Sequence, residues 1–267
     1  MNQEFLRQIL ERKWLEVKER KKKKPLSDLL SQLKEKSGDR RGQFSKAIRR
    51  LTGERLKLIA EIKRASPSRG LLRSDFKPVD IALIYEKSGA SAISVLTDEF
   101  FFQGSLEFLK EVSRAVALPA LCKDFIVDPY QLAEAKLSGA RAVLLIVAAL
   151  DKKILMTLEN SAREIGLETL IEVHDEKEIE IAMECHAEII GINNRDLKSF
   201  RVDLSQSERL VQKIPKSIIR VAESGISSAR EMKRLSECGF DAVLVGETFM
   251  KEPDIENKVK ELMSYEC

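Results

Sequence analysis

Residues 56–70 read LKLIAEIKRASPSRG, and this stretch joins an apolar run to an unusual ending. The first part has the character of a buried strand, in which residues two apart share one face. Ile59 is therefore followed on its own face by Glu61 and then by Lys63. The chain next breaks into Ser-Pro-Ser-Arg-Gly. A buried face that ends in opposite charges requires an explanation from the fold around it.

Seven further apolar runs follow this one, with a helical pattern between each pair. They are SAISVLT (91–97), PALCKDF (119–125), RAVLLIV (141–147), ETLIEVH (168–174), EIIGINN (188–194), SIIRVAE (217–223) and DAVLVGE (241–247). Parallel strands need a crossover helix at each step. Eight strand–helix units in about 210 residues fit a (β/α)8 TIM barrel, which we predict for residues 56–267 as the catalytic domain.

The alternative fold is a doubly wound open sheet, which also alternates strands and helices. Its usual nucleotide-binding signatures are GxGxxG and GxxxxGK[ST]. Neither signature occurs in the sequence. The barrel is therefore the favoured α/β architecture.

Residues 1–55 differ from the rest, because they are charged and only helical in pattern. We expect an N-terminal helical extension packed on the barrel. Its most basic run is ERKKKKP (19–25). One interpretation is an anion or nucleic-acid contact; the favoured one is a solvated helix end before Pro25, where cations suit the helix dipole.

Composition limits the class of protein. The chain has 267 residues, of which 43% are hydrophobic and 33% charged, so it can build a core and is neither disordered nor collagen-like. A net charge of +3 gives no general attraction to nucleic acid or to an anionic membrane. No apolar run reaches the roughly 18 residues of a transmembrane helix. The first residues, MNQEFLRQILERKW, lack the apolar region of a signal peptide.

The cysteines Cys122, Cys185, Cys238 and Cys267 form no CxxC pair, and the nearest two, Cys238 and Cys267, are 29 residues apart. This spacing predicts reduced thiols in a cytoplasmic protein. No cluster in the sequence has metal-ligand spacing, so we expect no metal.

Chemistry in a TIM barrel lies at the carboxyl ends of the strands. Reading only those ends gives a compact set of polar residues: Glu61, Lys63, Ser66, Lys123, Asp124, Glu172, His174, Asn193, Asn194, Arg195, Glu223, Ser224, Gly225, Gly246 and Glu247. Glu61 and Lys63 point into the barrel near its rim, where Lys123 and Glu172 join them. The alternative is a charge network that only stabilises the rim. The favoured interpretation is acid–base chemistry with tuned pKa values.

Two glycine-containing strand ends suggest a phosphate site. Ser224-Gly225 and Gly246-Glu247 follow the last two strands. In this fold those loops commonly bind phosphate through backbone N–H groups and a short helix. Each dipeptide alone also fits simple turn geometry, but both together favour a phosphorylated substrate.

Three other features leave alternatives open. Phe100, Phe101 and Phe102 fit either core packing or a flap over an aromatic substrate. His174 shares the parity of Glu172, and a structural, hydrogen-bonded role is favoured for it. Cys122 has the opposite parity to Lys123, so we expect it to face the helices as a small apolar residue.

The strand ends together resemble one enzyme family, indole-3-glycerol-phosphate synthase of tryptophan biosynthesis. The motifs are IAEIKRASPSRG, LCKDFIVDPYQ, LIEVHD, GINNRDL, VAESGI and LVGETFM. The likeness covers nearly the whole chain, including the helical extension. Position 69 is Arg where the family often has Lys, which keeps the charge.

The resemblance implies a lyase that acts on 1-(2-carboxyphenylamino)-1-deoxyribulose 5-phosphate. It closes the indole ring with loss of CO₂ and water, and no cofactor is needed because there is no net redox change. The implied active-site residues are Glu61, Lys63, Lys123, Glu172, Asn193 and Ser224.

The implied roles follow the chemistry of each side chain. Lys123 is the first candidate for the general acid, and Lys63 shares that duty. Glu172 stabilises the cationic intermediate, and Glu172 or Glu61 exchanges protons during dehydration. Asn193 holds a hydroxyl group or fixes Glu172. The substrate-binding residues implied are Ser66 and Arg195 for the anthranilate carboxylate, and Ser224, Gly225, Gly246 and Glu247 for the phosphate.

Three other functions remain as rivals. A phosphoribosylanthranilate isomerase would want a Cys and Asp pair at the strand ends. A Schiff-base aldolase would use Lys123 as a nucleophile with a depressed pKa. A non-catalytic RNA-binding or subunit-binding protein would use the basic segment 18–24. We expect the protein to bind a small phosphorylated substrate, and neither nucleic acid nor a membrane. We expect it to be a monomer, with which other tryptophan-pathway enzymes can associate.

Overall fold

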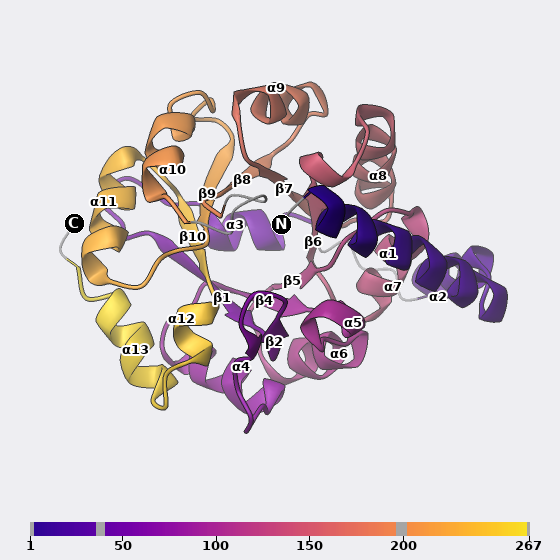
Figure 1. Ribbon diagram of the computed structural model, residues 1–267, viewed down its shortest axis with the longest axis horizontal. Coiled ribbons are helices and arrows are strands. Elements are labelled where there is room, and N and C mark those ends of the chain that lie inside the picture. Colours follow the sequence, from indigo (N-terminus) through magenta and orange to yellow (C-terminus); the bar gives the residue numbers. More distant parts are fainter. Residues whose placement is uncertain (1–2, 36–40, 196–201, 266–267) are drawn as a thin grey trace.

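The computed structural model describes residues 3–35, 41–195 and 202–265. Eight parallel strands close a barrel in the order β1-β10-β9-β8-β7-β6-β5-β4, and helices surround it (Figure 1). The strands are β1 (Lys57–Ile62), β4 (Ala92–Leu96), β5 (Ala120–Lys123), β6 (Ala142–Ile146), β7 (Glu168–Val173), β8 (Ile189–Asn193), β9 (Ile219–Glu223) and β10 (Ala242–Val245). The predicted (β/α)8 TIM barrel is confirmed.

At least one helix follows each barrel strand, as the sequence pattern predicts. These helices are α4 (Pro78–Lys87), α5 (Glu99–Phe102), α6 (Leu106–Ala115), α7 (Pro129–Leu137), α8 (Lys152–Glu164), α9 (Glu176–Glu184), α10 (Leu204–Val211), α11 (Ala229–Cys238), α12 (Glu247–Met250) and α13 (Ile255–Leu262), with a 3-10 turn η1 (Val147–Ala149). The short helices α5 and α12 and the turn η1 are additional to the predicted ones. Asp or Ser side chains cap many of their first turns by accepting a backbone N–H, as Asp128 does for α7 and Ser228 for α11.

Inside the barrel, alternate residues of each strand form one core. Ile59, Leu121 and Leu244 belong to it and are buried. The strand pairing places Glu61 of β1 opposite Ser94 of β4, and Asn193 of β8 opposite Glu223 of β9. Because side chains two apart share a face, the polar strand ends continue the same inward-facing columns. The predicted inward direction of Glu61 is confirmed by its burial.

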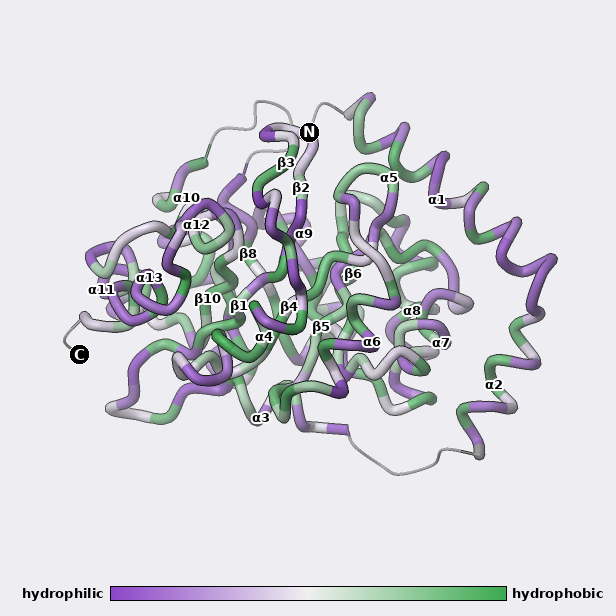
Figure 2. Tube along the Cα trace, turned by 90° about the horizontal axis from the view of Figure 1, so that it is seen from below, coloured by the Kyte–Doolittle hydropathy of each residue, from purple (hydrophilic) through white to green (hydrophobic). Residues whose placement is uncertain are grey.

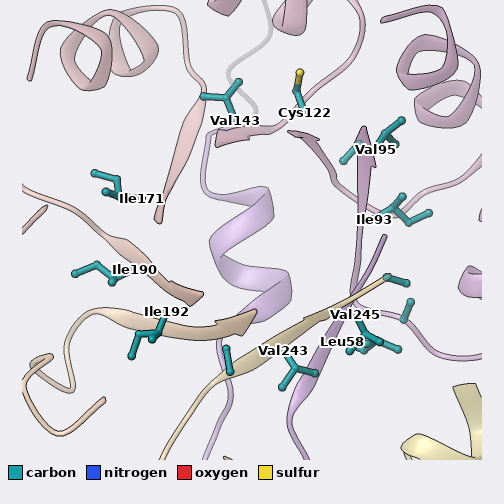
Figure 3. Packing of buried hydrophobic residues seen from close by; sticks show 14 of the residues in the cluster. Leu58, Ile93, Val95, Cys122, Val143, Ile171, Ile190, Ile192, Val243 and Val245 are labelled. Atoms are coloured by element: carbon teal, nitrogen blue, oxygen red, sulfur yellow. The ribbon is translucent and has the colours of Figure 1, made fainter. Parts of the chain in front are cut away.

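The outward-facing residues form a second, larger core between the strands and the surrounding helices. Figure 3 shows these residues, among them Ile93, Val143 and Cys122, pointing away from the barrel axis. Cys122 is buried in this layer, which confirms the predicted parity. The described cysteines Cys122, Cys185 and Cys238 are free, while Cys267 lies outside the described residues.

The three helices that precede β1 lie against one side and one end of the barrel. α1 (Gln3–Lys23) and α2 (Leu26–Glu35) run along one side, and α3 (Gln43–Ile48) lies at the end opposite β2 and β3 (Figure 2). Phe44 and Ile48 of α3 are fully buried in the inner core. The Glu168 carboxylate at the start of β7 accepts the backbone N–H groups of Phe44 and Ser45 at 2.9 and 2.8 Å. Helix α3 thus closes the amino end of the barrel.

The other end of the barrel stays open to receive a ligand. After β1 the chain forms a small antiparallel hairpin, β2 (Ala65–Ser66) with β3 (Gly70–Leu71), from the Ser-Pro-Ser-Arg-Gly stretch. Leu6 and Ile9 of α1 pack in the inner core near Phe125. None of the described helices has both the length and the apolar character to cross a membrane.

Candidate active site

One cavity opens at the carboxyl ends of the barrel strands. All eleven candidate residues from the sequence line it: Glu61, Lys63, Ser66, Lys123, Glu172, Asn193, Arg195, Ser224, Gly225, Gly246 and Glu247. They come from six strand ends that lie far apart in the chain. The fold therefore brings the whole predicted set together.

Glu61 and Lys63 form the first ion pair of the cavity. The Lys63 Nζ donates to Glu61 Oε1 at 2.6 Å, and Glu61 is only 2% exposed. Burial alone would raise the pKa of Glu61, but the ammonium groups of Lys63 and Lys123 outweigh it. The pKa of Glu61 is therefore lowered, and this carboxylate stays ionised. This arrangement explains why β1 ends its buried face with opposite charges.

Lys123 sits between two further carboxylates at the centre of the mouth. Its Nζ lies 2.8 Å from Glu223 Oε2 and 3.7 Å from Glu172 Oε2. Burial would lower the pKa of the Lys123 ammonium, but Glu223, Glu172 and Glu61 together raise it above its ordinary value. Lys123 is therefore held as a proton donor.

Glu223 is the cavity carboxylate whose pKa is raised by its surroundings. Burial raises the pKa of Glu223 to about 7, the neighbouring Glu172 adds to that shift, and Lys123 opposes it. Three buried carboxylates and two ammonium groups share the mouth, so one carboxylate holds a proton most readily. Glu223 is that group, and it titrates near neutral pH.

Two carboxylate oxygens in the mouth have no hydrogen-bond partner among the described residues. They are Glu61 Oε2 and Glu223 Oε1. Two glycines make the room that these carboxylates occupy: a Cβ on Gly246 would lie 2.4 Å from Glu61 Oε1, and a Cβ on Gly191 would lie 2.1 Å from Glu223 Oε1. Buried polar atoms normally find a partner, so these oxygens are prepared for a ligand.

Asn193 and Arg195 line the side of the cavity after β8. Asn193 Oδ1 accepts the backbone N–H of Arg195 at 3.0 Å. No hydrogen bond joins Asn193 to Glu172 in the part of the chain that the structure describes. Arg195 donates to Glu247 Oε2 at 3.2 Å. Of the GINNRDL motif, Asp196 and Leu197 lie outside the described residues.

The ends of β9 and β10 carry the residues predicted to bind phosphate, Ser224, Gly225, Gly246 and Glu247, which line the cavity. Ser224 and Gly225 have φ of 68° and 81°, the left-handed region that suits glycine. Asn194 is buried and donates its amide to the carbonyls of Glu223 and Ser224 at 3.0 and 3.2 Å, which fixes this turn. The short helix α12 begins at Glu247, directly after Gly246.

The Glu247 carboxylate is directed toward cations. Its Oε1 lies 2.5 Å from Lys251 Nζ and 3.3 Å from Arg69 Nε, and its Oε2 contacts Arg195. The pKa of Glu247 is lowered, because these cations outweigh the effect of burial. The backbone N–H groups of this turn can therefore face an anion while the side chain is held by cations.

An apolar wall faces the charged groups across the cavity. Leu96, Phe102, Phe125, Leu144 and Ile146 form it. The sequence left two roles open for Phe100, Phe101 and Phe102, core packing or a flap over the substrate, and the three rings lie in different places. Phe102 lines the cavity, Phe101 packs edge-on against Phe5 of α1, and Phe100 is exposed. A flat apolar group fits beside this wall.

Sequence reasoning gave two residues too little weight. Glu223 appeared among the strand ends, but no role was assigned to it. Its parity with Val221 placed it inside the barrel and was the signal to use. Lys13 was not identified at all, although its Nζ lies 2.7 Å from Asp98 Oδ2 and 2.8 Å from Asp124 Oδ1. Only the packing of α1 on β4 and β5 shows this contact.

The geometry also weighs against the rival functions. Cys122 faces the helices and not the mouth, so no Cys–Asp pair forms at the strand ends. The raised pKa of Lys123 is the opposite of what a Schiff-base nucleophile needs. In the basic segment, Arg20 pairs with Glu134 and Lys21 with Asp128 of the barrel. Within the described ranges, no three His, Cys, Asp or Glu side chains are arranged to hold a metal ion.

Comparison with known proteins identifies the family. The family model for indole-3-glycerol phosphate synthase matches residues 6–262. The chain belongs to the indole-3-glycerol phosphate synthase family. A family member from Dehalococcoides mccartyi (strain CBDB1) is 52% identical over 217 residues, which are 80% of this chain and 84% of the relative. Another from Chlorobium phaeobacteroides is 49% identical over 255 residues, covering 96% and 98% of the two chains.

Membership also agrees with a third relative and with the fold. The indole-3-glycerol phosphate synthase of Thermoanaerobacter pseudethanolicus is 44% identical over 258 residues, 97% of this chain and 96% of the relative. A mutant tryptophan synthase alpha-subunit from Pyrococcus furiosus has a TM-score of 0.61 at 17% identity, covering 77% and 97% of the chains. That likeness shows the barrel fold alone. The family resemblance read from the strand ends is therefore confirmed.

Proposed function

We propose that the cavity converts 1-(2-carboxyphenylamino)-1-deoxyribulose 5-phosphate to indole-3-glycerol phosphate, with loss of CO₂ and water. Family membership supports the reaction, and one observation supports the chemistry. That observation is Lys123, held protonated between Glu223 and Glu172 and facing an apolar wall. The site thus offers a proton donor, carboxylates and a flat apolar surface in one cavity.

In the first step Lys123 acts as the general acid. The ring carbon of the anthranilate that bears the carboxylate attacks the ketone carbon of the sugar, and a new carbon–carbon bond forms. The ketone oxygen gains negative charge as its double bond breaks, and it takes a proton from the Lys123 ammonium. A cation aimed at a developing oxyanion lowers the barrier, because the interaction is stronger in the transition state than in the substrate.

In the second step the ring loses CO₂. Ring closure leaves the former aromatic ring cationic, with its charge shared by the nitrogen. Breaking the bond to the carboxylate returns an electron pair to the ring and restores aromaticity. Glu172 lines the cavity with its carboxylate directed to the centre, and it stabilises this cation. The apolar wall supports the flat ring.

In the third step water leaves. The hydroxyl formed in the first step departs after it receives a proton from Lys123 or Lys63. A base removes a proton from the neighbouring carbon, next to the nitrogen, and the indole double bond forms. Glu172 is our candidate for this base, because its contacts with Lys123 and His174, at 3.7 and 3.4 Å, are longer than the 2.6 Å hydrogen bond that holds Glu61 to Lys63.

The remaining residues hold the two anionic ends of the substrate. The backbone N–H groups of Ser224, Gly225, Gly246 and Glu247 receive the phosphate, with Lys63 nearby. Ser66 and Arg195 bind the anthranilate carboxylate. The buried Ser66 hydroxyl has no hydrogen-bond partner among the described residues, which leaves it available to substrate. Asn193, on the same wall, holds a substrate hydroxyl.

We also propose that residues 1–55 form a helical extension of a monomeric, cytoplasmic enzyme. All eleven site residues come from a single chain, so the cavity needs no second copy. Light scattering of the purified protein across a range of concentrations tests the monomer. A mass of one chain at every concentration agrees with the proposal, and a stable dimer contradicts it.

The experiment that tests the reaction is a fluorescence assay of indole formation from the carboxyphenylamino-deoxyribulose phosphate. The assay is run with a metal chelator and with no added cofactor. Turnover under these conditions agrees with the proposed function. A folded protein that binds this substrate without forming indole contradicts it.

A further inference from the structure

The carboxylate that we propose as the base has a neighbour that the proposed mechanism does not use. His174 follows Glu172 by two residues at the end of β7 and shares its inward parity. Its ring Nε2 lies 3.4 Å from Glu172 Oε1. The other oxygen, Oε2, faces Lys123 at 3.7 Å. The two oxygens of Glu172 are therefore divided between two different cationic or potentially cationic side chains.

The ring of His174 is itself fixed from behind. Glu178 of α9 lies 3.1 Å from the ring Nδ1, and its Oε2 also accepts the His174 backbone N–H at 2.7 Å. Gln206 of α10 donates to the His174 carbonyl. The side chain is 12% exposed. Glu178 thus orients the ring, while Gln206 holds the backbone of the same residue.

This orientation decides which nitrogen carries a hydrogen. An ionised carboxylate only accepts hydrogen bonds, so Nδ1 carries the hydrogen toward Glu178. A neutral ring would then direct the lone pair of Nε2 at Glu172, which is unfavourable. A cationic ring directs N–H at Glu172 instead. Nε2 has no hydrogen-bond partner among the described residues, so it is a buried polar atom aimed at this carboxylate.

We propose that His174 is a positioning residue for Glu172, whose carboxylate it holds from the side opposite Lys123, through a chain of contacts that begins at Glu178. This inference rests on the proposed role of Glu172. The described titratable groups around the ring are Glu172, Glu178 and Glu223, all acidic. Burial would lower the pKa of His174, but these carboxylates raise it above its ordinary value.

The consequence is a cation whose effect on Glu172 depends on pH. The cationic ring donates its Nε2 hydrogen to Glu172, and the raised pKa of His174 extends the pH range over which the ring keeps this hydrogen. As the pH rises through the pKa of His174, the ring loses this hydrogen, Glu172 loses its partner, and the rate falls along a basic limb. A side chain with a purely structural role would affect stability without contributing this limb.

Two matched variants separate the contacts of the ring. His174→Asn places an amide near Nδ1 and keeps a partner for Glu178, but it does not reach Glu172. His174→Gln extends an amide toward Glu172. We expect His174→Asn to lower kcat about tenfold with KM within about twofold, and to remove the basic limb that His174 contributes to the rate profile. His174→Gln should recover much of kcat. Equal losses in both variants, or an unchanged basic limb, overturn the inference.

Glu172→Gln separates this inference from the proposed function. If His174 acts through Glu172, adding His174→Asn to Glu172→Gln lowers kcat by less than about twofold further. A full additional tenfold loss contradicts the inference. Wild-type turnover by Glu172→Gln alone contradicts the proposed role of Glu172 instead.

A direct measurement does not depend on activity or on the variants at position 174. The chain has two histidines, His174 and His186, so ring NMR signals are few. Glu178→Gln should move the His174 titration to lower pH by about one unit, because a carboxylate no longer stabilises the cation. An unmoved His174 titration overturns the inference.

Discussion

Lys13 is buried, with 2% of its side chain exposed, and Lys123 is partly buried, with 17% exposed. Each contacts two carboxylates of the barrel, and the contrast between them separates a structural cluster from a reactive one. Lys13 of α1 contacts Asp98 and Asp124 at 2.7 and 2.8 Å. Lys123 of β5 contacts Glu223 and Glu172 at 2.8 and 3.7 Å. Both ammonium groups have raised pKa values, because the carboxylates outweigh the effect of burial. Charge alone therefore does not tell them apart.

The difference is in what the carboxylates still lack. Around Lys13 all four carboxylate oxygens contact a donor atom within 2.8 Å: Asp98 Oδ2 meets Lys13 in an ion pair without a hydrogen bond, Asp98 Oδ1 accepts the Phe101 N–H, and Asp124 accepts the Thr97 hydroxyl and the Phe125 N–H. Around Lys123, Glu223 Oε1 has no partner among the described residues. A closed network stabilises a fold, whereas an open one can accept a substrate.

The largest expected effect is on catalysis at the mouth. Glu172→Gln keeps the size of the side chain but removes the charge and the base. We expect kcat to fall about 10³-fold, within the range for general acid–base groups, with KM nearly unchanged. Steady-state indole fluorescence measures both constants.

The matched control lies in the Lys13 cluster. Asp98→Asn removes one carboxylate beside a buried lysine but keeps an acceptor for the cap of α5. Its kcat should stay within about threefold of wild type, since one neutralised carboxylate outside the cavity removes no reacting group. Similar kcat losses in both variants would remove the distinction between the clusters.

The next effect is on stability at the structural cluster. Lys13→Met leaves Asp98 and Asp124 buried without their cation. Removal of one partner of a buried pair is strongly destabilising, so we expect the free energy of unfolding to fall by about 3 kcal/mol. Denaturant unfolding at pH 7 measures it. A change below about 1 kcal/mol would mean that α1 is not anchored by this lysine.

A smaller effect is expected from the glycine that makes room for Glu61. In Gly246→Ala the added Cβ would lie 2.4 Å from the Glu61 carboxylate, so that side chain must move. We expect a loss of stability of about 2 kcal/mol, as for other overpacked sites, and a clear loss of kcat. Thermal unfolding and the indole assay provide the two values. Wild-type kcat would show that the position of Glu61 does not matter.

The smallest effect concerns pH. The pKa of Glu223 is raised in the folded state to about 7, so the folded protein binds this proton more tightly than the unfolded chain does. This group therefore destabilises the fold as pH rises through that range. Glu223→Gln should therefore gain stability relative to wild type as the pH rises from 5 to 8. A difference that shrinks with rising pH contradicts the raised pKa.

Much of this comparison could be read from the sequence, because it depends on local periodicity. Alternation along β1 placed Glu61 and Lys63 inside the barrel, and the eight repeated units placed all the strand ends together. The same parity would have assigned Glu223, two residues beyond Val221. These inferences need only the pleat of a strand and the known end of the barrel.

Other features could not be read, because they depend on contacts between distant segments. Lys13 belongs to a helical pattern and looks like any surface lysine until α1 packs on the ends of β4 and β5. Gly191 lies in mid-strand, and the need for it arises only from Glu223 on the neighbouring strand. The contact of Glu178 with His174 joins a helix to a strand end and was equally hidden.

The most direct test of the central claim is single-turnover indole formation by Lys123→Ala, with substrate binding measured separately. If Lys123 is the general acid, this variant binds the substrate with nearly wild-type affinity and forms indole at least about 10³-fold more slowly. Lys13→Met, assayed as folded protein, should form indole at a rate within about threefold of wild type. Near-normal indole formation by Lys123→Ala would contradict the account and remove Lys123 from the acid role.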